Sequence, residues 1–290
     1  MSAPLISVIV PCYNGGRFLD GLLASLRAQT FQDFEVVIVD DGSTEEATLL
    51  KLKELESFAR VVYQENRHLP GARNTGFREA RAEIVLPLDC DDRLEPTFLD
   101  EVYIALRNAP DDVGFVFTHM RLAGGIEGIF RTHCNRFDQL FLNHMAYCLL
   151  VRKSAWQAVG GYDENMRDGS EDWAFNLALL RAGYRSVEVA RPLFIYAIRT
   201  DGMLLSRTAR MQATTWRQIR NKYPDLYRLT ALVKAWRECK PGWRSTAQAG
   251  ILMTLVSLLP ENLCNALFFR MNMFRRRRRI ARRELRLVES

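Results

Sequence analysis

Residues 83–92 read Glu-Ile-Val-Leu-Pro-Leu-Asp-Cys-Asp-Asp, an apolar run that ends on three carboxylates within four positions. A short run of this kind indicates a buried strand, with the carboxylates in the loop at its carboxyl end, where open α/β sheets bind ligands. Crowded carboxylates raise one another's pKa unless a cation compensates them, and Mg²⁺ prefers one or two carboxylates plus phosphate oxygens. A metal–phosphate site and a solvated acidic turn before a helix near residue 96 are both open here.

Two upstream segments repeat this pattern. Residues 34–43, Phe-Glu-Val-Val-Ile-Val-Asp-Asp-Gly-Ser, end an apolar run in paired carboxylates. Residues 5–14, Leu-Ile-Ser-Val-Ile-Val-Pro-Cys-Tyr-Asn, end another in a proline and an aromatic residue. Because strands and helical patterns alternate through this half, the sequence predicts an α/β fold with a doubly wound, mostly parallel sheet and helices on both faces. Three strand ends could then converge on one ligand.

The predicted elements follow from hydrophobic periodicity and from helix caps. The strands are expected at 6–10, 35–39, 60–64, 84–88, 113–119, 147–151 and 193–198. The helices are expected in the Leu19–Leu26 stretch, from Ser43 or Thr44, and at 70–81, 96–108, 154–159, 171–182 and 206–222. Gly124, Gly125 and Gly128 indicate a hairpin or a mobile loop between two of these segments.

Composition limits the class of protein. A chain of 290 residues, 48% of them hydrophobic, can hold one large domain or one domain plus an appendage. No apolar run reaches the roughly 18–20 residues of a membrane span, and the start Met-Ser-Ala-Pro does not resemble a secretory signal. The six cysteines are scattered without CxxC pairs, which favours buried thiols in a reducing compartment over a disulfide framework or a zinc site. We therefore expect a cytoplasmic protein.

Six motifs occur in a fixed order along residues 5–205. They read Val-Pro-Cys-Tyr-Asn, Val-Asp-Asp-Gly-Ser, Pro-Gly-Ala-Arg-Asn-Thr-Gly, Leu-Asp-Cys-Asp-Asp, Gly-Gly-Tyr-Asp-Glu and Ser-Glu-Asp-Trp. In this order and spacing the chain resembles the family 2 glycosyltransferases, which are inverting, metal-dependent enzymes of the GT-A fold with nucleotide-sugar donors. Each motif alone is too short to be specific.

The resemblance implies roles for individual residues. Pro11, Tyr13 and Asn14 would line the nucleotide base, with the Tyr13 ring against the heterocycle, although Tyr13 could also be an ordinary half-buried aromatic residue. Asp40 would accept the imide N–H of uracil or thymine. Asp41 would assist in this contact, or alternatively would be a turn residue. Ser43 is expected to be a helix cap. The remaining substrate contacts would come from Arg73, Asp89, Glu171, Trp173 and Arg199, and Asn74 would only hold a helix start.

The metal and the catalytic base are also implied by the resemblance. Asp89 and Asp91 match the family's Asp-X-Asp motif, which holds ribose and an Mn²⁺ or Mg²⁺ ion on the diphosphate, and Asp92 would be a further ligand or a support. Asp172 matches the catalytic base, which takes the proton of the acceptor hydroxyl. The alternative is that Glu171 and Asp172 are only favourable anions in the first turn of a helix.

Two departures from the family pattern are visible. Many relatives carry a histidine after the last core strand, where this chain has Asp201 and Arg199 nearby, so the third metal contact is in doubt. The Gln-X-X-Arg-Trp motif of processive synthases is also missing from the expected region. Transfer of a single sugar is therefore the expectation.

The last segment is strongly basic. Residues 226–290 carry 14 Lys and Arg against 4 Asp and Glu, whereas the first 225 residues carry 26 against 30. An apolar run at 249–259 and a helical apolar stripe at 263–274 precede eight arginines: five at 275–279, then Arg282, Arg283 and Arg286. This composition is typical of an anchor on anionic lipid, and a packed helical hairpin is the alternative. Nucleic acid is not expected, because no recognition motif accompanies the charge.

These observations give one main hypothesis and two rivals. The chain would have a catalytic domain at 1–225, with a nucleotide-binding half at about 1–120 and an acceptor-binding half at about 121–225, and a membrane-associating tail at 226–290. It would transfer one sugar from a UDP- or dTDP-sugar to a glycan or lipid-linked acceptor, in polysaccharide or glycolipid synthesis at the inner face of the cell membrane. The rivals are a nucleotidyltransferase and a catalytically silent nucleotide-sugar-binding scaffold in an envelope-assembly complex.

Overall fold

The structure is a computed structural model that describes residues 3–167, 169–199, 208–239 and 263. The chain divides into two compact units, residues 1–134 with 143–200 and residues 135–142 with 201–290. The boundary expected between residues 225 and 226 therefore falls inside the second unit.

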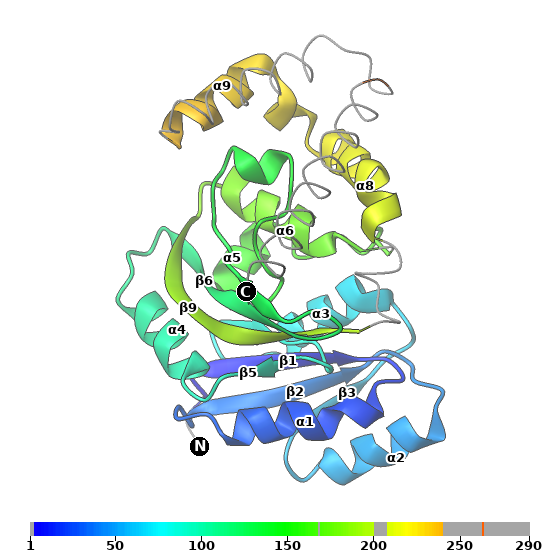
Figure 1. Cartoon of the computed structure of the whole chain (residues 1–290). Helices are drawn as coiled ribbons and strands as arrows, with labels where there is room; N and C mark the ends of the chain where they lie inside the picture. The colour runs from blue at the N-terminus through cyan, green and yellow to red at the C-terminus, as the bar shows by residue number, and fades with distance from the viewer. Residues whose placement is uncertain (1–2, 168, 200–207, 240–262, 264–290) are drawn as a thin grey trace, which may run out of the picture. The chain divides into compact units, whose positions relative to one another are not determined.

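The first unit is built on a sheet whose first half is parallel (Figure 1). The strand order is β3-β2-β1-β4, with bounds Ile6–Cys12 for β1, Phe34–Asp40 for β2, Arg60–Tyr63 for β3 and Ile84–Pro87 for β4. All seven residues of β1 are buried, as expected for a central strand that is covered on both faces. The register places Cys12 beside Asp40 and Ile9 beside Pro87, so neighbouring strands end at the same edge.

Helices cover both faces of this sheet, because alternate residues of a strand point in opposite directions. Val8 and Val10 of β1 pack in one core cluster with α1, α2 and α4, whereas Ile9 packs in a second cluster with α3, α5 and α6. The helices run Gly16–Arg27 (α1), Glu46–Leu55 (α2), His68–Glu79 (α3), Phe98–Arg107 (α4), Lys153–Ala158 (α5) and Glu171–Arg181 (α6). The predicted fold class is confirmed.

The second half of the sheet is mixed. Beyond β4, the order continues β8-β6-β9-β5, with bounds Leu150–Arg152, Val113–Gly124, Arg185–Ile198 and Arg93–Leu94. β8 is antiparallel to β4 and β6, while β6 and β9 are parallel. The predicted hairpin is confirmed, because β7 (Gly128–Phe130) pairs with β6. Gly124 has φ +102, and a Cβ there would lie 2.7 Å from the Ile198 carbonyl oxygen.

Most strands differ from their predicted bounds by one or two residues, β6 ends at Gly124 rather than 119, and two further strands differ more at their starts. β8 begins at Leu150 rather than 147, and β9 begins at Arg185 rather than 193. The pairing of β9 with β6 is irregular between Thr118 and Met120, where a register shift occurs. A bulge of this kind interrupts the two-residue alternation, so hydrophobic periodicity finds only the regular end of the strand.

The described part of the second unit is helical. It contains η1 (Asp138–Leu140), α8 (Thr208–Lys222), η2 (Pro224–Tyr227) and α9 (Leu229–Glu238). The Leu140 carbonyl oxygen accepts hydrogen bonds from the Trp216 indole N–H at 2.9 Å and from the Tyr227 hydroxyl at 2.7 Å. The apolar run and the arginine cluster predicted as a membrane anchor lie outside the described residues, apart from Leu263. In the described part, no helix is long and apolar enough to span a bilayer.

Candidate active site

The ends of β1, β2 and β4 meet at one edge of the sheet. The Asp41 N–H donates to the Cys12 carbonyl oxygen at 2.8 Å, and the Leu88 N–H donates to the Ile9 carbonyl oxygen at 2.9 Å. These bonds continue the two strand pairings past the last paired residues. The three segments singled out in the sequence therefore lie side by side.

The turn after β1 exposes an aromatic ring and bonds the segment just before α2. Pro11 is buried within the strand, whereas Tyr13 is 53% exposed. Asn14, at φ +51, accepts the N–H groups of Thr44 and Glu45 through its Oδ1 atom, at 2.8 and 3.0 Å. The side chain of Asn14 is thus bonded to backbone N–H groups just before α2, and its amide nitrogen donates to the Thr44 hydroxyl at 3.2 Å.

The expected helix start at Ser43 or Thr44 is wrong, because α2 begins at Glu46. The Ser43 hydroxyl accepts the Asn14 N–H at 2.9 Å, so Ser43 does not cap the helix as expected. Asn14, from another segment, instead accepts the N–H groups of Thr44 and Glu45 just before the helix, and cap rules consider only residues next to the helix.

The two carboxylates after β2 have different surroundings, although both are only 3% exposed. Asp40 Oδ1 accepts the Ser43 N–H at 3.2 Å. Asp41 Oδ1 accepts the Gln64 amide at 2.6 Å and the Arg67 N–H at 2.8 Å, and burial raises the pKa of Asp41. Asp41 therefore ties the end of β2 to the loop before α3, while Asp40 lies next to the exposed turn of Tyr13.

Arg73 on α3 joins two acidic segments that are far apart in sequence. Its guanidinium is 1% exposed and donates to both Asp89 oxygens at 2.8 and 3.0 Å, and to Glu171 Oε1 at 2.5 Å. It also lies over the rings of Tyr147 and Tyr162, at 4.6 and 5.5 Å from their centroids. Arg73 therefore fixes the acidic loop after β4 to the start of α6.

The acidic loop after β4 has one buried and two accessible carboxylates. Asp92 is 2% exposed; its Oδ2 atom accepts the Tyr147 hydroxyl, and its Oδ1 atom accepts the Ala197 N–H at 2.7 Å. Burial, followed by the charges of Asp89 and Asp91, raises the pKa of Asp92 well above its ordinary value. The side chains of Asp89 and Asp91 remain 23% and 31% exposed. This geometry favours the supporting role for Asp92.

A three-carboxylate metal site is not formed by this loop. Within the described chain, Asp89, Asp91 and Asp92 do not bring three ligand oxygens within 4.8 Å of one another. The reason is that both Asp92 oxygens face the interior. Asp89 and Asp91 fit an ion that takes one or two protein carboxylates and completes its shell with phosphate oxygens.

Asp172 lies in the first turn of α6, and its carboxylate is fixed from two sides. Oδ2 accepts the Asn143 amide at 2.9 Å, and Oδ1 accepts the Trp173 N–H at 2.7 Å. Burial, followed by the negative charge of Glu171, raises the pKa of Asp172 to about 7. A carboxylate with this pKa is poised to accept a proton near neutral pH. Glu171 itself is buried against Arg73 and fixes the helix start to α3.

The other predicted contacts are placed differently. Trp173 is 3% exposed, and Asn74 bonds the Tyr162 backbone from both ends of its amide, at 2.9 and 2.8 Å, rather than holding the start of α3. Arg199 lies at 4.0 Å from Asp91 and over the Phe18 ring at 4.3 Å. Asp201 lies outside the described residues.

Three aromatic or amide residues of the site were not predicted. Tyr147 accepts the Asp89 N–H at 2.9 Å and donates to Asp92, Tyr162 supports Arg73, and Asn143 orients Asp172. Tyr162 belongs to the Gly-Gly-Tyr-Asp-Glu motif, which is the one signal that could have indicated it. Asn143 lies in a segment without a pattern, and Tyr147 was expected only as the first residue of a strand, although the structure places both in an irregular segment.

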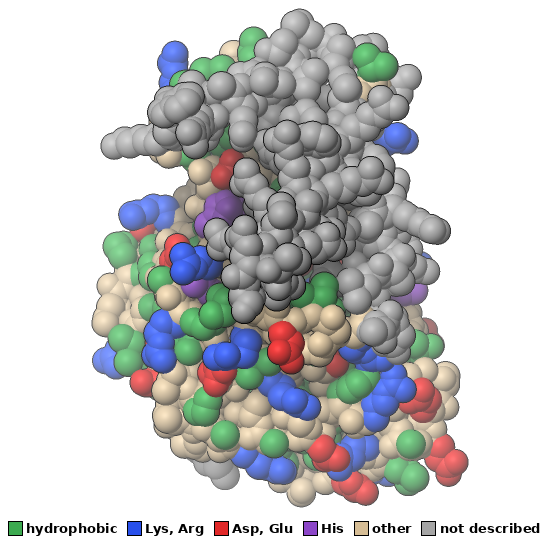
Figure 2. Space-filling view, viewed as in Figure 1, with side chains coloured by type: hydrophobic (Ala, Val, Ile, Leu, Met, Phe, Trp, Pro, Cys, Tyr) green, Lys and Arg blue, Asp and Glu red, His purple; other side chains and the backbone are tan. Residues whose placement is uncertain are grey.

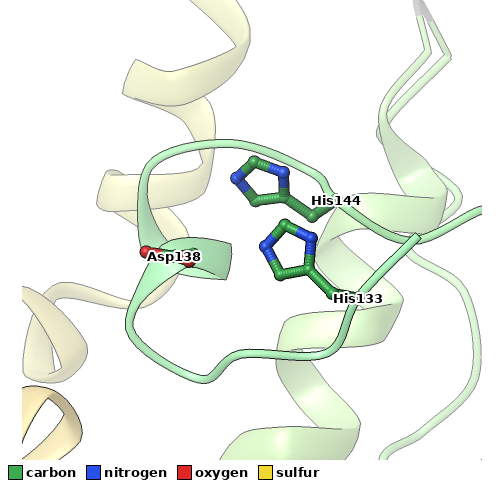
Figure 3. A group of neighbouring side chains, drawn as sticks. All are labelled: His133, Asp138 and His144. Atoms are coloured by element: carbon green, nitrogen blue, oxygen red, sulfur yellow. The ribbon is translucent and has the colours of Figure 1, made fainter. Parts of the chain in front are cut away.

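Two further pairs of neighbouring side chains are a pair of cysteines at this edge and a pair of histidines away from it. The Cys12 and Cys90 side chains are neighbours: the interaction with Cys90 lowers the pKa of Cys12, whereas the interaction with Cys12, followed by burial, raises the pKa of Cys90. Away from this edge, the His133 and His144 rings lie with centroids 4.2 Å apart, and the His133 N–H donates to the His144 carbonyl oxygen at 3.2 Å (Figure 3). Asp138, also drawn in Figure 3, belongs to η1 of the second unit.

Solved structures share this fold. The chain aligns with S. aureus TarS residues 1–349 in complex with UDP-GlcNAc at a TM-score of 0.59 and 21% identity, covering 74% of this chain and 65% of that one. It aligns with the mannosyltransferase PcManGT of Pyrobaculum calidifontis, in complex with GDP-Man and Mn²⁺, at a TM-score of 0.57 and 19% identity, covering 92% and 85%. The fold is therefore that of the GT-A glycosyltransferases.

Sequence comparisons identify the family. Residues 7–143 match the model of Glycosyl transferase family 2. The uncharacterized glycosyltransferase EpsJ of Bacillus subtilis is 36% identical over 210 residues, which cover 67% of this chain and 61% of the relative. With three other curated relatives, the match spans between 33% and 38% of the relative's length. The chain belongs to the family 2 glycosyltransferases, with the family domain in its first half.

Proposed function

We propose that the chain transfers a single sugar from a nucleotide-sugar donor to an acceptor hydroxyl, with inversion at the anomeric carbon. The observation that carries this proposal is the Arg73 bridge. One buried guanidinium bonds both Asp89, in the loop for the donor, and Glu171, the neighbour of the proposed base Asp172. The loop proposed to bind the donor and the helix that carries the proposed base are thereby bonded to the same buried side chain.

The donor would lie along the edge formed by β1, β2 and β4. Tyr13 offers an exposed ring to the base, and Asp40 lies in the adjacent strand end, in register with Cys12. A carboxylate accepts the imide N–H of uracil or thymine, a donor that cytosine lacks in that form. We infer a UDP- or dTDP-sugar on this basis; the fold neighbours themselves bind UDP-GlcNAc and GDP-Man.

Asp89 and Asp91 would hold a divalent ion on the diphosphate. Their partly exposed oxygens fit a hard cation such as Mn²⁺ or Mg²⁺, which takes one or two protein carboxylates together with phosphate oxygens. The chemistry that such an ion supplies is compensation of the charge that develops on the leaving diphosphate. Arg199 lies beside Asp91 and could add a positive charge to the same phosphates.

Asp172 would act as the general base. Its carboxylate takes the proton of the acceptor hydroxyl while that oxygen bonds the anomeric carbon and the nucleoside diphosphate leaves from the opposite face. The amide of Asn143 and the Trp173 N–H keep the carboxylate oriented. Asn143 is therefore a positioning residue, and a pKa of about 7 lets Asp172 be ionised before transfer and protonated after it.

The membrane role of residues 226–290 is a proposal from sequence. We infer that the basic segment attaches the chain to anionic lipid at the inner face of the cell membrane, near a glycan or lipid-linked acceptor. On the face shown in Figure 2, basic and acidic side chains of the described residues are interspersed. The excess of positive charge is thus a property of the last segment rather than of this face.

A donor screen tests the proposed function. The purified full chain is incubated with UDP-, dTDP- and GDP-sugars in Mn²⁺, Mg²⁺ or chelator, and release of nucleoside diphosphate is measured. We expect slow release from one uridine or thymidine donor, stimulated by metal and by the correct acceptor. Binding without any release, even with acceptors, would favour the scaffold, and release of pyrophosphate from a sugar phosphate and a nucleoside triphosphate would favour a nucleotidyltransferase.

A further inference from the structure

Two thiols meet at the centre of the candidate active site. Cys12 is the last residue of β1, and Cys90 lies between Asp89 and Asp91 in the loop after β4. These strands are parallel neighbours, with Ile9 in register with Pro87, so each cysteine lies three residues beyond that pair. Adjacent strands are about 4.8 Å apart, a spacing that suits a disulfide.

Gly15 supplies a second, independent observation on the same pair. A Cβ atom on Gly15 would lie 2.7 Å from Cys90 Sγ and 3.4 Å from Cys12 Sγ. Both sulfurs therefore border the same small space beside the backbone, and a glycine at this position leaves that space to them. Glycine at position 15 of the turn after β1 thus leaves room for the two thiols to lie close together.

The two sulfurs differ in access. Cys12 is 1% exposed, whereas Cys90 is half-buried. A small oxidant from solvent would therefore reach Cys90 first, with Cys12 behind it. An accessible thiol beside a second, resolving thiol is one feature of redox-sensitive cysteines.

We propose that Cys12 and Cys90 are a redox-responsive pair that closes to a disulfide when a hydroperoxide enters the site. The hydroperoxide transfers one oxygen to one sulfur of the pair, which gives a sulfenic acid and releases water from hydrogen peroxide or an alcohol from an organic hydroperoxide. The other sulfur then attacks the oxidised sulfur, the S–S bond forms and water leaves. The two thiols lose two electrons, the peroxide O–O bond is reduced, and a dithiol reductant reverses the change.

Closure would alter donor binding, and this consequence rests on the proposed function. The S–S bond is about 2 Å long, much shorter than the van der Waals contact between two unbonded sulfur atoms. Closing it draws the loop that carries Asp89 and Asp91 toward the turn that carries Tyr13. The distance between the proposed nucleobase contact and the proposed diphosphate contact then changes, so that the donor no longer fits both. The disulfide form is therefore the inactive form.

Peptide mapping of the full chain tests the pairing. The protein is reduced, freed of reductant, treated with hydrogen peroxide, alkylated and digested without reduction for mass spectrometry. We expect a Cys12–Cys90 linked peptide that dithiothreitol removes. It should be lost in Cys90→Ser and kept in Cys134→Ser, which changes another half-buried cysteine. Conversion of Cys90 to sulfinic acid, or its alkylation, without the linked peptide would overturn the pairing.

Nucleotide binding of the same samples tests the consequence. We expect the affinity for UDP, measured by calorimetry with Mn²⁺, to fall at least tenfold on oxidation and to return on reduction. An unchanged affinity in a sample with the linked peptide would overturn the switch. If neither UDP nor dTDP binds even to the reduced chain, the proposed function fails, while the linked peptide still supports the pair.

Discussion

The neighbours of Asp172 determine the pKa of its carboxylate and therefore its suitability as a general base. Burial and Glu171 disfavour the ionised form, while Asn143 and the Trp173 N–H favour it. The pKa of Asp172, raised to about 7, is the result of this competition. Arg73 acts in the same sense as Asn143, because its positive charge lowers the pKa of Asp172.

The first prediction concerns pH. Since Asp172 must be ionised to accept a proton, transfer should be slow at pH 5, rise through about pH 7 and level off above it. Asn143→Ala removes a hydrogen bond to the ionised form, so the midpoint of kcat/KM should move to higher pH. Asn165→Ala is the matched control, because Asn165 also donates to a carboxylate, Asp163, at 3.1 Å. A midpoint that does not move in Asn143→Ala contradicts the positioning role.

The second prediction concerns stability at Arg73. Arg73→Met leaves Asp89 and Glu171 without their buried partner, and breaking a buried ion pair typically costs about 3–5 kcal/mol of unfolding free energy. Arg78→Met on the same helix changes an exposed arginine and should cost under about 0.5 kcal/mol. Urea unfolding of both variants measures the difference. Equal stabilities would show that the bridge is not part of the core.

At the scale of elements, the placement of α3 against β1 determines where Arg73 lies. Gly76 on α3 faces Ile9 of β1, and an added Cβ would lie 2.8 Å from the Ile9 Cβ. The contact is between a helix and a central strand, neither of which can move without disturbing the core. A glycine therefore lets α3 approach closely enough for Arg73 to reach both Asp89 and Glu171.

The third prediction follows from that contact. Gly76→Ala should destabilise the protein by about 1–3 kcal/mol through overpacking, although alanine is the better helix former. Gly21→Ala on α1 is the control, because its Cβ would meet only the flexible end of Arg93. We expect Gly21→Ala to be neutral or stabilising in thermal unfolding. Stabilisation by Gly76→Ala would contradict the close packing of α3 on β1.

The sequence was most informative where elements are regular. Continuous Val and Ile runs located β1, β2 and β4, and the polar residues after each run located the site edge. The same reasoning could not find Tyr147 or Asn143, because an irregular segment carries them to partners 58 and 29 residues away. It also could not foresee that the oxygens of Asp92 face inward, because burial of one carboxylate among three depends on Tyr147 and on β9.

For the whole molecule, the chain combines two units with different compositions. The first unit contains every described residue that we assign to catalysis, whereas the arginine-rich segment belongs to the second. An attraction to anionic lipid that depends on charge weakens as salt shortens the screening length. Attachment and chemistry are therefore expected to be separable.

The fourth prediction tests that separation. Removal of residues 249–290 should release the protein from anionic vesicles and leave hydrolysis of a soluble donor mostly unchanged. Binding of the full chain should weaken as salt rises, because each basic residue near the surface contributes about 1 kcal/mol through charge. Vesicle sedimentation at low and high salt measures both effects. Aggregation of the truncated chain would instead favour packing of this segment on the rest of the protein.

The turnover of Asp172→Asn tests the central claim most directly. The amide is close in shape to the carboxylate but cannot take the acceptor proton, so transfer should fall by about 10²–10⁴ while donor affinity stays within a few fold. Because a folded-state pKa of about 7 lies above the ordinary value of 3.8, ionised Asp172 costs stability above pH 7 and not below pH 4. Asp172→Asn should accordingly unfold at a higher temperature than the native chain at pH 8.

The matched control is Asp112→Asn, which changes an exposed aspartate whose side chain is 52% accessible. Initial rates of sugar transfer and calorimetric donor affinity, measured on the native chain and both variants at pH 8, give the decisive comparison. We predict a loss of transfer in Asp172→Asn alone, with donor binding preserved in all three proteins. Full transfer by a folded Asp172→Asn protein would contradict the assignment of Asp172 as the base.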